Sequence, residues 1–392
     1  MWIPKSEKEI TEAAANRTLE ETVTFEGKRE TSNKSVDIAT DLSAFANTSG
    51  GVVIYGLAED SNRKLTILNP IRLKGERERI DQIVRTCVDE VPFLKISAIE
   101  TKDDPSIGYL VVVIPPSERA PHMVIVKGEK RFYGRGDTGN FILSQAEVAR
   151  LYERRRVSEA SILPLLEQAI KEAPVPDNER FAHLHIVARP VLADDTLLDR
   201  ALSSGKNHKE LLTQVIDQIS SSGIYKDGYV PDIGHPGSGW IRRPEGYRGN
   251  CQYERDEDMA VHFQFNLDGS AYFFSGRAAE AHRESQPKSF FSSIVAGSTT
   301  KFLAVLGELY DRANYFGMVD VGLSVTGLHG CIPDMPRDPF RELPKFARSN
   351  YQKTARSSAM LLKEDPRNLA ARLIMPLVDA VSQGTDDPFK LG

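Results

Sequence analysis

The sequence predicts an α/β (α+β) protein, with a compact first α/β domain and a second α/β domain after it. The length of 392 residues suits two domains of ordinary size. Strand-like and helix-like runs alternate along the chain, as is typical of this class. Residues 158–180 are helical and then turn-like in composition, which is typical of a linker. The predicted domains are therefore 1–157 and 181–392, joined by a helical linker over 158–180.

The first domain opens with elements of different hydrophobic period. Residues 4–20 indicate a short polar helix, and residues 21–30 alternate as a half-buried strand does. Residues 35–47 carry apolar side chains at helical spacing, and a glycine pair ends that helix. The apolar run 52–57 predicts a buried strand.

The rest of this domain continues the alternation. The patterns predict a helix over 75–91, strands over 96–100 and 109–115, a hairpin over 122–136 and a helix over 144–156. This last helix begins with the serine and glutamate spacing of a capping box.

The second domain also mixes strands and helices. We expect strands over 181–191 and 319–328, a helix over 299–316, and a hairpin over 262–276 with an Asp-Gly turn. The tail from about Pro344 is expected to be largely helical. This part of the chain resembles no family that we recognise.

Composition and charge limit the classes of function. The net charge of −5 argues against coating nucleic acid by bulk charge, but it is compatible with a local basic groove. Three scattered cysteines form no CxxC pair, which argues against a zinc ribbon or a disulfide framework. The sequence has no signal-like or membrane-length apolar run, so we expect a cytoplasmic protein without a membrane partner.

Several motifs follow one another in the first domain. Glu21 is separated from Glu26 by four residues, and Lys28 follows. The run Ala-Phe-Ala-Asn-Thr-x-Gly-Gly occupies residues 44–51, ahead of an apolar strand and the pair Glu59-Asp60. A proline-histidine pair precedes the expected hairpin, which carries an aromatic residue, an arginine and a glycine. In order and spacing, residues from about 15 to 156 resemble the Schlafen AlbA-like domain, also described as a divergent AAA-type domain.

The resemblance implies a fold and a chemistry. The fold is the Schlafen AlbA-like mixed sheet with flanking helices. Nuclease members of the family use three acidic residues for metal-dependent cleavage of transfer RNA and ribosomal RNA. By position these fall on Glu21, Glu26 and Glu59, with Asp60 as the alternative for the third. The implied function is that of a hydrolase, a divalent-metal-dependent endoribonuclease that acts on tRNA or other structured RNA, in stress or phage defence, with Mg²⁺ or Mn²⁺ as cofactor. One departure is Gly27, which stands where the family usually has an aromatic residue.

Strand geometry sets a condition on this hypothesis. Carboxylates from different elements can converge on a hard cation, which neutralises phosphate and activates water. Glu21 and Glu26 are an odd number of residues apart, so one strand would direct them to opposite faces. They converge only if Glu21 lies in the corner before the strand. Lys28 shares a face with Glu26 and could either hold a phosphate or form a simple salt bridge.

Basic and aromatic residues alternate on the expected hairpin, namely Lys127, Lys130, Arg131, Tyr133 and Arg135. Basic residues beside aromatic ones suit contacts to phosphates and stacked bases, so these five are the expected nucleic-acid-binding residues. The arginines at 154–156 are better explained by the preference for positive charge at a helix C-terminus. RNA is the favoured partner over DNA, and the acidic overall charge favours a compact substrate held at few phosphates.

Other motifs have a structural explanation. The Asn-Thr-x-Gly-Gly run lacks the lysine of a P-loop, so the sequence gives no support for ATP hydrolysis. His183 and His185 lie two apart on one strand face, but no third metal ligand is near, so a core role is favoured.

Other classes of function stay open. The chain could be a non-catalytic DNA-binding transcriptional regulator or an ATP-binding module, with a second domain that senses a ligand or drives dimerisation. It could also be an interaction protein within a larger assembly. The eukaryotic nucleases of the family pair two lobes, and here a homodimer or a diverged second lobe in residues 181–392 could supply the second one.

Overall fold

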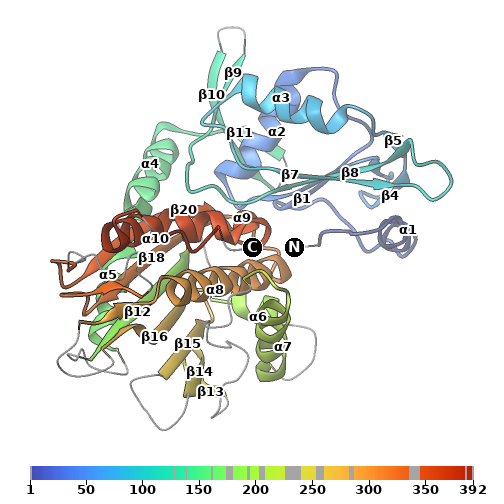
Figure 1. Ribbon diagram of the computed structural model, residues 1–392. Coiled ribbons are helices and arrows are strands. Elements are labelled where there is room, and N and C mark those ends of the chain that lie inside the picture. Colours follow the sequence, from blue (N-terminus) through green and yellow to red (C-terminus); the bar gives the residue numbers. More distant parts are fainter. Residues whose placement is uncertain are drawn as a thin grey trace. The chain divides into compact units, whose positions relative to one another are not determined.

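The computed structural model divides the chain into two compact units, Met1–Glu159 and Ala160–Gly392 (Figure 1). It describes residues 2–126, 129–137, 139–159, 162–173, 180–191, 195–202, 208–225, 240–252, 260–281, 287–334, 345–384 and 386–390. Helices and several sheets occur together, which confirms the predicted α+β class. None of the helices in these ranges combines the length and apolar character that a membrane crossing requires.

The first unit is built on a five-stranded mixed sheet. Its strands are β1 (Phe25–Lys28), β2 (Gly51–Tyr55), β8 (Ile107–Ile114), β5 (Ile71–Arg72) and β7 (Lys95–Glu100). The order is β1-β2-β8-β5, with β7 also paired to β8. Strands β1 and β2 are parallel and the other pairs are antiparallel. Two parallel strands must be joined by a crossover connection, and here a helix between β1 and β2 forms that connection.

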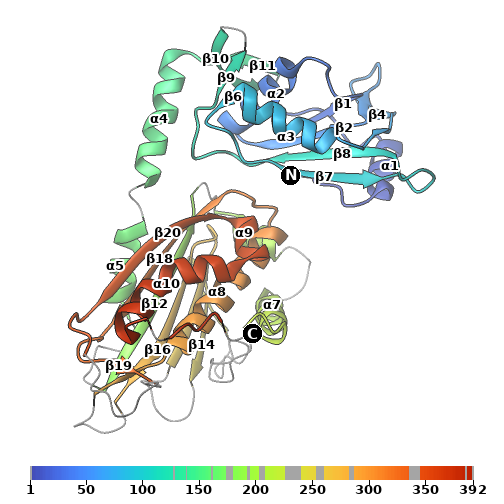
Figure 2. The same cartoon turned by 45° about the horizontal axis from the view of Figure 1, so that its top comes forward.

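That crossover helix, α2 (Ser35–Asn47), lies at the centre of the first unit. Its apolar side chains, among them Ile38, Leu42 and Phe45, are buried against the sheet and against α3 (Glu76–Cys87). Figure 2 shows both helices on one face of the sheet. The predicted spacing over 35–47 therefore corresponds to the observed helix.

A second sheet packs on the other side of α2. It has the order β11-β10-β9-β6, from β11 (Gly139–Ile142), β10 (Glu129–Gly136), β9 (Met123–Val126) and β6 (Val88–Asp89). The strands β9 and β10 form the expected hairpin, and both contact α2. A separate two-stranded ribbon joins β3 (Leu57–Glu59) to β4 (Leu65–Leu68).

Two further helices belong to this unit. Helix α1 is shorter than the predicted helix over 4–20 and covers Glu7–Ala15. Helix α4 (Gln145–Glu159) begins after Ser144, whose hydroxyl accepts from the Glu147 N–H while Glu147 accepts from the Ser144 N–H. This reciprocal pair is the capping box that the sequence indicated.

The second unit contains a nine-stranded sheet whose main path is antiparallel. The path is β13 (Trp240–Arg243), β14 (Gly246–Gln252), β15 (Ala260–Asn266), β16 (Ala271–Glu280), β12 (Phe181–Pro190), β18 (Met318–Thr326) and β20 (Tyr351–Ser358). Short strands β17 (Ser289–Phe290) and β19 (Ile332–Pro333) extend it from β16. The Asp-Gly hairpin joins β15 to β16, with Gly269 at a φ of 82°.

The main hydrophobic core of the second unit lies on one face of this sheet. That face packs on α8 (Ser292–Arg312) and α10 (Pro366–Ser382), with α6 (Leu197–Ala201), α7 (His208–Ser221) and α9 (Ala359–Glu364) beside them. Alternate residues of β12 point there, and Val187 points to the opposite face. On that opposite face lies α5 (Ile162–Lys171), whose Ile162 and Leu166 pack on Val187. The helix within the expected linker thus contributes to the core of the second unit.

The predicted helical tail needs a correction. Helices α9 and α10 occupy part of it, but residues 351–358 form strand β20 along β18. The segment YQKTARSS alternates in burial and ends the strand order of its sheet. Polar and charged residues are common on such edge strands, so the segment lacks the apolar signal of a central strand.

Candidate nucleic-acid site in the first unit

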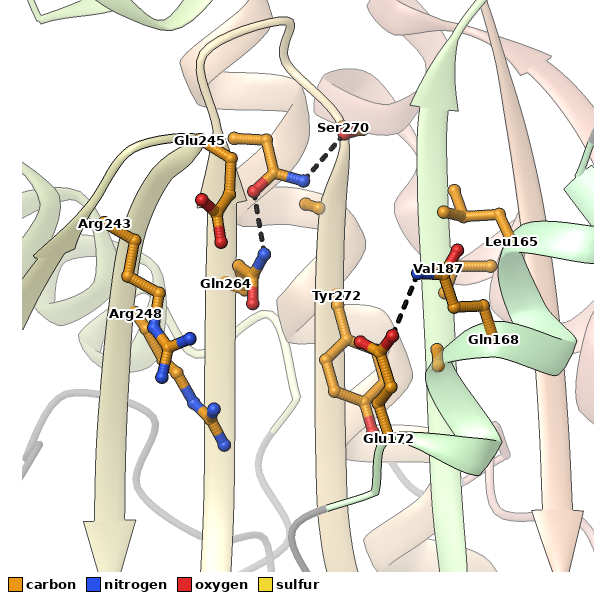
Figure 3. Close-up of a pocket in the computed structure, with 13 residues that line it drawn as sticks. Leu165, Gln168, Glu172, Val187, Arg243, Glu245, Arg248, Gln264, Ser270 and Tyr272 are labelled. Carbon is orange, nitrogen blue, oxygen red and sulfur yellow. Dashed lines mark hydrogen bonds between the residues drawn. The ribbon is translucent and has the colours of Figure 1, made fainter.

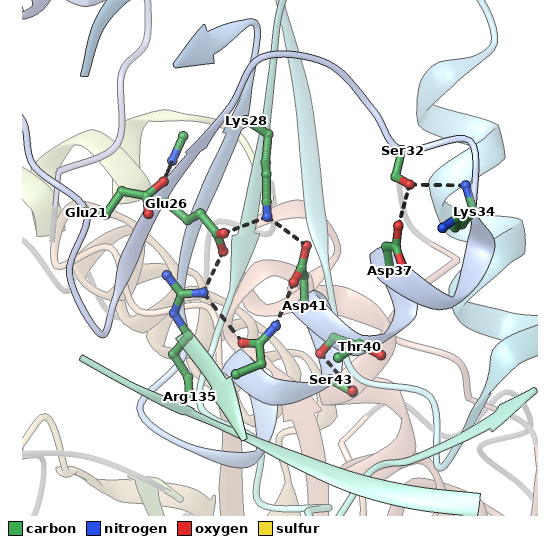
Figure 4. Close-up of polar contacts among 12 residues, drawn as sticks. Glu21, Glu26, Lys28, Ser32, Lys34, Asp37, Thr40, Asp41, Ser43 and Arg135 are labelled. Atoms are coloured by element: carbon green, nitrogen blue, oxygen red, sulfur yellow. Dashed lines mark hydrogen bonds and ion pairs between the residues drawn. The ribbon is translucent and has the colours of Figure 1, made fainter. Parts of the chain in front are cut away.

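Glu26 is a buried carboxylate on β1, with 5% of its surface exposed. Its Oε1 lies 2.7 Å from Lys28 Nζ, and its Oε2 accepts from Arg135 Nη1 at 2.8 Å (Figure 4). Lys28 is two residues along the same strand, so the two side chains share a face. A buried carboxylate needs such partners, because removal from water is costly for an unpaired charge.

Asp41 of α2 extends this network, and the sequence analysis missed it. Its Oδ2 lies 3.3 Å from Lys28 Nζ, and its Oδ1 accepts from Asn140 Nδ2 at 2.6 Å. Burial raises the pKa of Asp41, and the Glu26 charge adds to that effect. Burial lowers the pKa of Lys28, but Asp41 and Glu26 outweigh it and the net pKa is raised. A charged residue at i+3 from Ile38 on an otherwise apolar helix face was the available signal.

Arg135 was expected at a nucleic-acid surface and instead lies buried, with 7% exposed. Its guanidinium binds Glu26 and lies over the Phe45 ring, 4.7 Å from the centroid. The alternation of β10 explains this position, because Tyr133 and Arg135 share the face that packs on α2. Arg135 therefore links the hairpin to β1 from inside the unit.

Glu21 lies in the corner before β1, outside any helix. A turn joins the backbone N–H and C=O groups of Thr22 and Phe25, at 2.9 and 3.3 Å. It brings the Glu21 carboxylate back over the strand, where Oε1 accepts from the Gly27 N–H at 3.3 Å. Burial raises the pKa of Glu21, as do the charges of Glu26 and Glu59. The three acids are thus close enough for their charges to interact, although the first two are an odd number of residues apart.

Glu59 and Asp60 occupy different environments at the end of β3. Glu59 is half-buried, and its carboxylate has no hydrogen-bond partner among the described residues. Asp60 accepts from the N–H groups of Asn62 and Lys64 and from the Thr66 hydroxyl, and it pairs with Arg17 at 2.6 Å. These bonds close the β3–β4 turn, so Asp60 has a structural role and Glu59 is the acid that faces Glu21.

Gly27 leaves room for the ribbon to approach β1. A Cβ at this position would lie 2.4 Å from Leu65 Cδ2 and 2.9 Å from the Leu57 carbonyl oxygen. The aromatic residue that the family usually has here would collide with β3 and β4. The departure in sequence therefore accompanies close packing of the ribbon that carries Glu59.

Asn47 fastens α2 to the hairpin, which gives the Asn-Thr-x-Gly-Gly run a structural role. Its Nδ2 donates to the carbonyls of His122 and Tyr133 at 3.0 and 2.8 Å, and its Oδ1 accepts from the His122 N–H at 2.7 Å. Gly50 has a φ of 68°, and a Cβ there would lie 2.5 Å from Pro116 N. Burial lowers the pKa of His122 to about 4, so this ring is neutral at pH 7.

The remaining basic candidates do not form one surface. Lys130 and Arg131 are exposed but point to opposite faces of β10, and Tyr133 is partly buried against the core. Lys127 lies outside the described residues. Arg154 donates to the Ser117 carbonyl, and Arg155 pairs with Glu90 at 3.4 Å. These last two arginines stabilise the unit itself.

A hollow of about 520 Å³ opens beside the acid network. Its walls include Lys28, Asp41 and Tyr55, together with residues of the loop that leads into α2. The Tyr55 hydroxyl is buried without a hydrogen-bond partner among the described residues. A lysine and an unsatisfied hydroxyl on one wall are suited to hold a phosphate oxygen.

Few side chains of this site are available as metal ligands. Within the described ranges, no three acidic, histidine or cysteine side chains form a group that could hold one. Both Glu26 oxygens are taken by Lys28 and Arg135. Glu21 and Glu59 remain as hard oxygen donors, and Mg²⁺ is commonly held by one or two carboxylates together with substrate phosphates. The residues present therefore fit a two-carboxylate site and not a closed protein cage.

The mixed sheet, the crossover helix and the buried acid–base network define an α+β domain with an acidic site beside a hollow. Residues 21–144 match the sequence model of the Schlafen, AlbA_2 family. The first unit therefore contains a Schlafen AlbA-like domain, as the residues predicted, although the match covers less than half of the chain. This match indicates a nucleic-acid-binding domain.

The other comparisons add little. No curated protein matches the chain significantly. Among solved structures, the DIP2311 protein from Corynebacterium diphtheriae matches at 13% identity with a TM-score of 0.22, over 49% of this chain and 32% of that one. The chain thus spans about a third of that protein, and the likeness is too weak to support an argument.

Proposed function

We propose that the first unit is a divalent-metal-dependent endoribonuclease that acts on tRNA or other structured RNA. The observation that carries this proposal is the position of Glu21, which is close enough to Glu26 and Glu59 that their charges add to the effect of burial and raise its pKa. Like charges are brought together at a cost, and perturbed carboxylates of this kind are concentrated at functional sites.

Charge balance supports a requirement for a cation. Four carboxylates, Glu21, Glu26, Glu59 and Asp41, surround two cations, Lys28 and Arg135. This excess of negative charge repels a phosphate. A bound Mg²⁺ or Mn²⁺ would reverse the local charge, polarise the phosphate and lower the pKa of a bound water.

Each residue then has a distinct task. Glu21 and Glu59 would hold the ion, because neither carboxylate is engaged by a cation of the described chain at short range. Lys28 would bind a phosphate oxygen from the wall of the hollow, with Tyr55 as a neighbouring donor. Glu26 positions Lys28 and Arg135, and it can become a third ligand only when Lys28 exchanges it for the substrate phosphate.

The test compares neighbouring glutamates. The full chain is incubated with tRNA and Mn²⁺ or Mg²⁺, alongside Glu21→Gln, Glu59→Gln and the control Glu20→Gln. Glu20 is exposed and pairs with Lys64, so its replacement removes one charge next to Glu21 without touching the site. We expect at least about a hundredfold loss of cleavage for the two site variants and none for the control.

Metal binding gives a second readout that needs no activity. Mn²⁺ should raise the melting temperature of the wild type and of Glu20→Gln, because an ion that binds only the folded state stabilises it. The effect should be lost in Glu21→Gln. The proposal fails if wild-type cleavage does not exceed that of the variants, or if Mn²⁺ stabilises all proteins equally.

A non-catalytic nucleic-acid-binding module is the second candidate. Two observations favour a binding module without catalysis. Both Glu26 oxygens are engaged by Lys28 and Arg135, and the described ranges contain no group of three side chains that could hold a metal. Retained binding of RNA or DNA without cleavage, and without stabilisation by Mn²⁺, would select this function.

A further inference from the structure

The second unit has a hollow of about 320 Å³ on the sheet face opposite α8 (Figure 3). Strands β13 to β16 form its floor, and α5 forms one wall. Most of its lining is polar, with amides, two arginines, two glutamates and a tyrosine. Its size is that of a small-molecule site.

Two arginines stand together at one end of this hollow. Arg243 of β13 and Arg248 of β14 direct their guanidinium groups side by side (Figure 3). Neither has an ion pair with a carboxylate in the described part of the chain. Burial lowers the pKa of Arg248, and the neighbouring Arg243 charge lowers it further. Two like charges without an ion-pair partner among the described residues form a site for an anion, which two guanidinium groups can hold with paired hydrogen bonds.

His262 fixes the orientation of Arg248. Its Nδ1 lies 3.3 Å from an Arg248 Nη2 that donates to it. Burial lowers the pKa of His262 to about 4, and the Arg248 charge acts in the same direction. The ring is therefore neutral at pH 7 and can accept this hydrogen bond, so Arg248 is positioned without being neutralised.

The opposite end of the hollow suits a flat ring. The Tyr272 side chain lies across from the arginines, and Leu165, Ala169 and Val187 supply an apolar wall. Glu172 accepts from Gln168 Nε2 at 2.9 Å beside Tyr272. A ligand ring could thus contact apolar side chains and Tyr272 while its N–H or O–H groups donate to Glu172.

We propose that this hollow binds a ring-bearing organic anion of mononucleotide size, with the anionic group on Arg243 and Arg248 and the ring beside Tyr272. Phosphate and carboxylate share the chemistry that the arginines recognise. The site lies wholly within the second unit and does not depend on the function proposed for the first.

The experiment is calorimetric titration of the full chain with four classes of probe. These are the nucleoside 5′-monophosphates, the corresponding nucleosides, inorganic phosphate, and aromatic carboxylates such as benzoate. We expect the monophosphates to bind at least about tenfold more tightly than nucleosides or phosphate alone, because each probe lacks one half of the recognition. Tighter binding of the carboxylates would support the site and assign a carboxylate ligand.

Variants connect binding to the two arginines. Arg243→Gln and Arg248→Gln should each weaken binding at least about tenfold. Arg242→Gln removes the same charge from the neighbouring position, where the side chain is directed to Tyr247, and should leave binding unchanged. Melting temperatures check that every variant is folded. Absence of binding by all probes to the wild type, or equal binding by the three variants, would overturn the proposal.

Discussion

The two units place the charged groups of their polar sites differently. In the first unit, acidic groups exceed basic ones around Glu26, and its two cations are already engaged by carboxylates. In the second unit, Arg243 and Arg248 lie together without a carboxylate partner in the described chain. The local charge of a site indicates the sign of what it binds, so the acidic site of the first unit suits a cation and the arginine end of the second unit's hollow suits an anion.

The comparison also separates two uses of arginine. Arg135 is buried and holds two sheets together through Glu26 and Phe45. Arg248 is held by a neutral histidine, which leaves its charge available to a ligand. The partner of an arginine, and not its presence in a basic run, therefore distinguishes a structural residue from a binding one.

The strongest way to break the comparison is Glu26→Ala. This change leaves Arg135 buried without its counter-ion, so the first unit should lose about 3–5 kcal/mol of stability while the second is unaffected. The two tryptophans allow separate measurement, because Trp2 packs on Phe25 in the first unit and Trp240 lies in the core of the second. Urea unfolding followed by fluorescence of Trp2→Phe and Trp240→Phe backgrounds would measure each unit.

The control for this prediction is Asp81→Asn, which breaks the exposed pair with Arg85. Exposed pairs contribute about 0–1 kcal/mol, so this variant should be close to the wild type. Equal losses in the two variants would show that burial of Glu26 has no energetic consequence.

A steric change sharpens the comparison by leaving the charges in place. Gly27→Ala puts a Cβ within 3 Å of Leu65 and the Leu57 carbonyl, and it should cost up to about 3 kcal/mol in the first unit alone. Gly136→Ala is the matched control, because its Cβ would meet Phe141 at 3.6 Å, an ordinary contact. Differential urea unfolding of the two variants measures the difference, and similar midpoints would contradict the packing described for the ribbon.

The smallest expected effect is a difference in pH dependence. Burial lowers the pKa of His122 to about 4, so the unfolded state takes up a proton near pH 6.5 that the folded state refuses. Stability is thus present above pH 6.5 and falls as the pH is lowered, by roughly 2 kcal/mol at pH 5. His262 has the same direction but is more exposed, so the second unit should lose less.

Unfolding at pH 7 and pH 5 would measure this effect in both units, with His122→Gln as the variant that removes the titrating group. Glu21 and Asp41 act in the opposite direction, because their pKa values are raised and the folded state takes up their protons more readily than the unfolded state. The His122 contribution is therefore the difference in pH dependence between the wild type and His122→Gln, and equal pH dependence of the two proteins would contradict a buried neutral His122.

Local patterns predicted much of the first unit. The spacing of Ile38, Leu42 and Phe45 gave the bounds of α2, and the apolar run after the glycine pair gave β2. Periodicity is strong where one face is buried along several turns or a whole strand. The edge strand β20 was missed because its sequence, YQKTARSS, is mostly polar and lacks the apolar signal of a strand.

The site was less accessible to such patterns, because its bonds join distant parts of the chain. Arg135 meets Glu26 across 109 residues, and Asn140 meets Asp41 across 99. The burial of Arg135 depends on the register of β10. The position of Glu21 depends on a turn between Thr22 and Phe25, which a single extended strand would not contain. The family resemblance identified the acids, but only the folded chain separates Glu59 from Asp60.

Asn47 has a consequence for where an RNA would be cut. Its three hydrogen bonds, with the Arg135–Glu26 pair, join the β9–β10 hairpin to α2 and β1. Lys130 and Arg131 on that hairpin are then held at a constant spacing from Glu21 and Glu59. Under the proposed function, an RNA phosphate that contacts Lys130 or Arg131 would lie at a fixed number of nucleotides from the cleaved bond, so the products would have a defined length.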